Sequence, residues 1–148
     1  MSEEKPKKIN TNAKGYRNEQ KTARYLEKLG YIVCTTQRSS HRGNNDFFNA
    51  FDHIAVLGAE TFYYKRVFKV KTQKMTYALN QVVFVQTRSN RKGSTDKIRQ
   101  FAESTNSGMN SILIFVWKDR EARPCIYTWD QYNKIFVEII MEDDMKTI

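Results

Sequence analysis

The feature of this sequence that most constrains its fold is the apolar run at residues 81–85, QVVFV. A short run of β-branched and aromatic residues is typical of a buried central strand. The run continues into the neutral Gln86 and then, two positions later, into the cation Arg88. We therefore predict a central strand over residues 81–86 that delivers two polar side chains to a site at its end. The alternative is an ordinary strand that ends in an exposed polar pair.

The rest of the chain alternates between helical and strand-like patterns. The predicted helices cover residues 13–29 and 94–104, and the other predicted strands cover residues 31–36, 51–57, 111–117 and 125–129. Residues 61–75 alternate as a hairpin or long edge strand with a basic face would, and residues 130–141 fit either a helix or a strand. This order predicts an α/β sandwich with a central mixed β-sheet flanked by helices. We expect a flexible arm over residues 1–12 and a single domain over residues 13–148.

The composition is that of a folded basic protein. Lys and Arg total 25 against 16 Asp and Glu, a net charge of +9, and 40% of the residues are hydrophobic. Such an excess favours a polyanionic partner such as DNA, although charge for solubility alone is the alternative. Cys34 and Cys125 lack the spacing of a zinc site. We expect a soluble, cytoplasmic protein with no membrane segment and no signal peptide.

Two acidic residues occupy positions that folding alone does not favour. Glu19 shares the helix face of Ala23 and Leu26, where a carboxylate needs a partner or a metal ion unless it is partly solvated near the helix start. Asp52 opens a predicted strand, where aspartate has poor propensity, and its alternative is a turn aspartate bonded to nearby backbone. Asp46 fits an Asx-type turn and is a second candidate for the same site.

Four segments of the chain carry a resemblance to a known family. They are residues 15–31 (GYRNEQKTARYLEKLGY), 38–48 (RSSHRGNNDFF), 51–56 (FDHIAV) and 82–88 (VVFVQTR). In this order they resemble the PD-(D/E)XK nuclease superfamily, and within it the small Holliday junction resolvase-like nucleases of archaea and their viruses. The resemblance spans residues 15–104 and implies a restriction-endonuclease-like form of the α/β sandwich.

The resemblance implies a catalytic site made of Glu19, Asp52, Gln86 and Arg88. The first three would be ligands of Mg²⁺, with Mn²⁺ as the other candidate, since a hard divalent cation prefers oxygen ligands. The family has an acidic residue where this chain has Gln86, so the metal affinity should be lower. The family has a lysine where this chain has Arg88, which keeps its proton and can steady a phosphate but cannot act as a general base.

The resemblance also implies a DNA-binding surface. The expected DNA-binding residues are Arg38, Ser39, Ser40 and Arg42 in a serine-containing loop, and Lys65, Arg66, Arg91 and Lys92 in the basic segments. A solvated polar surface is the alternative for both sets. The chain is thus expected to be a homodimeric, metal-dependent DNA endonuclease, resolvase-like or non-specific, with no small-molecule cofactor. The alternatives are a catalytically weak or inactive DNA-binding module on the same fold, and a basic viral interaction protein without DNA affinity.

Overall fold

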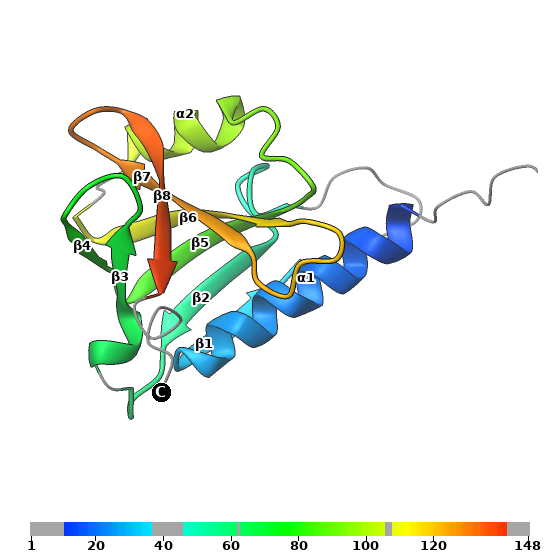
Figure 1. Ribbon diagram of the computed structural model, residues 1–148, viewed down its shortest axis with the longest axis horizontal. Coiled ribbons are helices and arrows are strands. Elements are labelled where there is room, and N and C mark those ends of the chain that lie inside the picture. The colour runs from blue at the N-terminus through cyan, green and yellow to red at the C-terminus, as the bar shows by residue number, and fades with distance from the viewer. Residues whose placement is uncertain (1–10, 37–45, 62, 106–107, 142–148) are drawn as a thin grey trace, which may run out of the picture.

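Eight strands form one mixed β-sheet in the computed structural model of the protein, which describes residues 11–36, 46–61, 63–105 and 108–141 (Figure 1). The strands are β1 (Tyr31–Thr35), β2 (His53–Leu57), β3 (Val67–Val70), β4 (Thr76–Ala78), β5 (Val82–Ser89), β6 (Asn110–Trp117), β7 (Cys125–Asp130) and β8 (Ile135–Met141). The helices are α1 (Thr11–Lys28), the short 3₁₀ helix η1 (Tyr63–Arg66) and α2 (Asp96–Ser104). The strand order is β1-β2-β5-β6-β7-β8-β3-β4.

The two helices cover opposite faces of this sheet. Strands β5 and β6 are parallel and α2 lies in the connection between them, whereas the other paired strands are antiparallel. Alternate residues of β6 enter two separate cores: Phe115 packs in the core that includes Leu26 of α1, and Ile114 packs in the core that includes Ile98 of α2. Burial on both faces explains why β6 is a continuous apolar run. The predicted α/β sandwich with a central mixed sheet and flanking helices is confirmed.

The hairpin of β3 and β4 folds back over the face that α1 covers. Phe68 of β3 and Leu79, just after β4, belong to the same core as α1. The hydroxyl of Tyr31 donates a hydrogen bond to the carbonyl of Asn80 at 2.7 Å, and the backbone N–H of Asn80 donates to Ser111 Oγ at 2.9 Å. The sheet therefore curls until the end of its last strand contacts the beginning of its first.

Several element boundaries differ from the sequence predictions. Helix α1 begins at Thr11, two residues earlier than predicted, and Gly30 after it has φ 98°, a conformation that favours glycine and ends the helix. A Cβ at Gly30 would lie 2.3 Å from Thr61 Oγ1, so this position also needs glycine for space. Strand β5 runs to Ser89, beyond the predicted end.

Two predicted segments change their assignment. For residues 61–75 a hairpin forms, but only its first strand, β3, lies within the predicted segment, and the second, β4, begins just after it. The strand prediction is wrong at Tyr63–Arg66, which form η1. The open choice for residues 130–141 resolves to a turn followed by β8. Residues 1–10 of the predicted arm and residues 37–45 of the predicted loop lie outside the described residues. Within the described ranges, no helix is long and apolar enough to cross a membrane.

Candidate active site

Asp52 lies immediately before β2, and its hydrogen bonds place it beside the end of β5. Its backbone N–H donates to the carbonyl of Val85 at 3.0 Å, and its Oδ2 accepts a hydrogen bond from the backbone N–H of Thr87 at 2.9 Å. The carboxyl group thus lies against the peptide group that joins Gln86 to Thr87. Asp52 is only 5% exposed. The structure therefore places the Asp52 carboxyl group, from one predicted motif, against the backbone that joins Gln86 to Thr87, from another.

Asp52 is surrounded by other carboxyl groups. Burial raises its pKa to about 8, against the lowering effect of the Thr87 N–H, and the charges of Asp46 and Glu19 raise it further. Asp46 also forms a hydrogen bond with the Asp52 carboxyl group. Glu19, on α1, is 8% exposed. The charges of Asp46 and Glu19 thus act on the Asp52 carboxyl group, and together with its burial they favour its protonated form.

Gln86 and Arg88 point to the face of the sheet that α2 covers, as alternate residues of one strand must. They line a cavity of about 340 Å³ together with Asp46 and Asp96. Gln86 Oε1 is buried and accepts no hydrogen bond from the residues that the structure describes. Arg88 donates from Nη2 to the carbonyl of Ser94 at 3.3 Å, while its Nε is buried and has no acceptor among the same residues. The cavity thus presents one unused acceptor and one unused donor to any group that enters it.

The donor set suits a hard divalent cation. Within the described part of the chain, no three Asp, Glu, His or Cys side chains form a group that could hold a metal ion. The predicted ligand set, however, consists of two carboxylates and one amide oxygen, Glu19, Asp52 and Gln86. Oxygen donors of this kind are those that Mg²⁺ selects, and a cation would offset the repulsion that raises the pKa of Asp52. Gln86 Oε1, buried and without a hydrogen bond from the described residues, is an oxygen donor that fits such a cation.

The sequence analysis missed a buried hydrogen-bond network. This network fixes Thr87, the residue that binds Asp52. His53 is fully buried, with Nδ1 2.9 Å from Thr35 Oγ1 and Nε2 3.0 Å from Thr87 Oγ1. Thr87 Oγ1 lies 2.8 Å from Thr22 Oγ1, which also accepts a hydrogen bond from Trp117 Nε1 at 2.8 Å. The available signal was a histidine at a buried position of the alternating run FDHIAVL. The network joins α1, β1, β2, β5 and β6 directly beneath the candidate site.

The direction of the protons in this network can be derived. The Thr22 hydroxyl donates to the carbonyl of Asn18 at 3.1 Å, so its oxygen can only accept from Thr87. Thr87 has then used its proton and must accept one from His53, which fixes the neutral tautomer with hydrogen on Nε2. Burial lowers the pKa of His53 to about 4, consistent with this neutral form. His53 thereby holds Thr87, whose backbone N–H binds Asp52.

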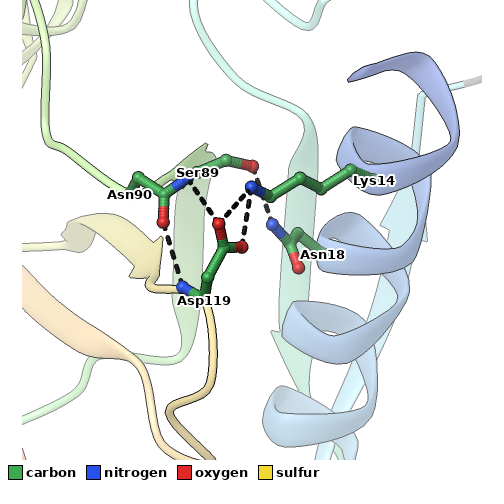
Figure 2. A network of polar contacts seen from close by, with 5 residues as sticks. All are labelled: Lys14, Asn18, Ser89, Asn90 and Asp119. Atoms are coloured by element: carbon green, nitrogen blue, oxygen red, sulfur yellow. Dashed lines mark hydrogen bonds and ion pairs between the residues drawn. The ribbon is translucent and has the colours of Figure 1, made fainter. Parts of the chain in front are cut away.

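A second polar cluster fixes the N-terminal half of α1 to the end of β5 (Figure 2). Asn18 Nδ2 donates to Ser89 Oγ at 2.7 Å, and Lys14 Nζ lies 2.6 Å from Asp119 Oδ1. Asp119 in turn exchanges hydrogen bonds with Asn90. Asn18 directly precedes Glu19, so the cluster fixes the helix next to the acidic residue that reaches Asp52.

The structure separates the residues predicted to bind DNA. Arg91 and Lys92 follow the end of β5, beside the candidate site, and the Lys92 ammonium lies 4.9 Å from the ring centroid of Tyr127. Lys65 and Arg66 lie on η1, near the start of β5, so roughly 25 Å of strand separates the two pairs. Arg66 donates from Nη1 to the carbonyl of Leu79 at 2.8 Å. The other predicted residues, Arg38, Ser39, Ser40 and Arg42, lie outside the described residues.

Comparisons with known proteins give few matches. No protein-family model matches the chain, and no curated protein matches it in sequence. One solved structure to which the chain is similar is Hjc of Archaeoglobus fulgidus, a Holliday junction resolvase from an archaeal hyperthermophile. That protein is 12% identical, the match covers 87% of this chain and 89% of that chain, and the TM-score is 0.42. The function proposed below therefore depends on this chain's own residues.

Proposed function

We propose that this protein is a metal-dependent DNA endonuclease that hydrolyses phosphodiester bonds, either with the structure selectivity of a Holliday junction resolvase or without it. The observation that carries the proposal is the placement of Asp52, whose carboxyl group forms a hydrogen bond with Asp46, lies within the influence of the Glu19 charge and accepts the backbone N–H that follows Gln86. The same residues belong to the segments that resemble the PD-(D/E)XK nucleases. The net charge of +9 suits a nucleic-acid substrate.

Each site residue has a role that its chemistry allows. Glu19, Asp52 and Gln86 would hold Mg²⁺ or Mn²⁺, which when bound polarises a phosphoryl oxygen and lowers the pKa of a coordinated water. Asp52 gives up its proton when it becomes a ligand. Arg88 stays charged and steadies the phosphate from the shared cavity. Arg38, Ser39, Ser40 and Arg42, with Arg91 and Lys92, would bind backbone phosphates near the cut.

The decisive experiment measures cleavage of a synthetic four-way junction and of supercoiled plasmid with Mg²⁺ or Mn²⁺. We expect wild-type protein to cut at least one substrate, and Asp52→Asn and Glu19→Gln to lose roughly 10²-fold or more in rate, as removal of metal ligands does. Glu103→Gln, at an exposed position on α2, removes one acidic charge away from the site and should keep full activity. Equal activity in all four proteins would contradict the proposed site.

A DNA-binding module without cleavage is the second candidate. It is favoured by Gln86, which brings no charge to a metal, and by Arg88, which cannot act as a base. Salt-dependent binding of both substrates without any nicking, at every metal concentration, would support this candidate against the nuclease.

We also propose a homodimer, because two symmetric cuts in a four-way junction require two active sites related by a two-fold axis. Light scattering during size-exclusion chromatography should give the mass of two chains. A mass of one chain at micromolar concentration would contradict the dimer without affecting the proposed chemistry.

A further inference from the structure

A basic hollow of about 410 Å³ lies between α1 and the loop that joins β6 to β7. Its cationic residues are Lys14, Arg17, Lys21, Lys118 and Arg120. Asp119 and Glu121 are the acidic residues that line it. We infer that this hollow, called the α1 hollow below, binds backbone phosphates of DNA away from the scissile bond. The inference rests on the proposed function, to which it adds a second contact surface.

The α1 hollow faces away from the candidate active site. Lys14, Arg17 and Lys21 follow one another at helical spacings of three and four residues, so they share one side of α1. Glu19 is two residues from both Arg17 and Lys21, which places it roughly 160° around the helix from them. The two sites therefore flank one helix about 10–12 Å in diameter. At about 3.4 Å per nucleotide along one DNA strand, a separation of one helix diameter corresponds to roughly three nucleotides.

The walls of the α1 hollow are held in place by the polar cluster of Figure 2. Lys14 is bound to Asp119, whose backbone N–H donates to Asn90 Oδ1 at 3.0 Å, so the loop after β6 is tied to both α1 and the end of β5. Asp119 thereby offsets the charge of Lys14. The Lys21 ammonium lies 5.4 Å from the ring centroid of Trp117. This cation–π contact favours a position of the ammonium group over the hollow.

The remaining cations are available to a ligand. Arg17 and Lys118 are exposed, and neither forms an ion pair within the part of the chain that the structure describes. Arg120, also exposed, is held at φ 65° in the turn after β6. With Lys21 they leave four positive charges against the single carboxylate of Glu121. Cations on a fixed framework bind phosphate groups by charge and do not read the bases.

The test is DNA binding by fluorescence anisotropy in EDTA, with a 30-base-pair duplex and salt from 50 to 300 mM. Arg17→Gln/Lys21→Gln removes two exposed cations of the α1 hollow. Arg99→Gln/Lys134→Gln removes the same charge from α2 and from the turn before β8, outside the hollow. We expect the first variant alone to flatten the slope of log K against log salt by about 2, because each phosphate contact contributes roughly 0.9. Its affinity at 100 mM salt should fall roughly tenfold or more.

Glu121→Gln provides a gain-of-function arm that does not depend on the first variant folding. Removing this carboxylate from the α1 hollow should raise the affinity for the duplex a few-fold. If wild-type protein binds DNA but the two double variants have equal slopes and Glu121→Gln changes nothing, the α1 hollow is not a DNA contact, and the proposed nuclease is unaffected. If wild-type protein shows no salt-dependent DNA binding, the inference and the proposed function both fail.

Discussion

At the scale of single residues, Asp52 combines a cost for folding with the central role in the proposed chemistry. Its folded pKa of about 8 lies above the ordinary value of 3.8, so its neutral form stabilises the fold below about pH 4, and this contribution is lost as the pH rises through 8. The asparagine amide keeps an acceptor for the Thr87 N–H and cannot ionise. In EDTA at pH 9, we expect Asp52→Asn to be more stable than wild type by on the order of 1–3 kcal/mol.

Thermal denaturation from pH 6 to 9 checks this expectation. The stability difference should grow with pH, and cleavage should be lost. The neighbouring His53, whose folded pKa is lowered to about 4, destabilises the fold as the pH falls from 6.5 toward 4, so it does not contribute above pH 7. A stability difference that stays constant over this pH range would contradict the raised pKa of Asp52, which its burial causes first and the neighbouring carboxyl groups second.

Gln86 gives a second prediction at the residue scale. Its Oε1 is buried without a donor, so the site already holds an oxygen where a cation could use it. In Gln86→Glu we expect Mn²⁺ affinity to rise tenfold or more, because a unit charge at 4 Å contributes roughly 4 kcal/mol before desolvation. Without metal, Gln86→Glu should be less stable than wild type, since it adds a carboxylate to those of Glu19, Asp46 and Asp52. Calorimetric titration measures the affinity, and Gln81→Glu, at the exposed start of the same strand, should leave it unchanged.

At the scale of elements, the attachment of α1 to the sheet depends on Thr22. This fully buried side chain accepts hydrogen bonds from Thr87 and Trp117 and donates one to Asn18. Thr22→Val leaves a hydroxyl and an indole N–H without partners, so we expect it to cost about 1–3 kcal/mol of unfolding free energy in urea denaturation. Combined with Trp117→Phe, a double-mutant cycle should give a coupling of about 1 kcal/mol. Additive effects would show that the indole bond contributes nothing.

The same elements show how far sequence patterns reach. Helix α1 follows from its periodicity and the central strand β5 from its apolar run. The burial of Glu19 follows from the apolar face of the helix, whereas its place in one site with Asp52 came from the family resemblance. The sequence could not show that Asp46, a candidate turn residue, bonds to Asp52, because that contact depends on how the segment before β2 folds. Local alternation also predicted strand where η1 forms, since aromatic residues suit a strand as well as a packed turn. The partners of His53 come from separate strands, which no local pattern specifies.

At the scale of the whole molecule, Tyr31 joins the two ends of the curled sheet. It is buried at the start of β1, and its hydroxyl donates to the carbonyl of Asn80 beyond β4. Burial raises its pKa to about 12, while the nearby Arg66 lowers it in part. Because the folded pKa lies above the ordinary value of 10, the unfolded chain releases this proton first. The stability that Tyr31 contributes is therefore complete below pH 10 and is lost as the pH rises through 12.

We expect this loss to reach about 1–2 kcal/mol between pH 10 and 12. In Tyr31→Phe the hydrogen bond to Asn80 is absent, so the variant should be less stable than wild type by about 1 kcal/mol at pH 8. Above pH 10 the difference should shrink, because only wild type must keep a buried phenol protonated. Urea denaturation at pH 8, 10 and 11.5 measures it, and changes in lysine charge affect both proteins alike. Parallel curves with a constant offset would mean that this phenol does not stay protonated at the contact between the first and last strands.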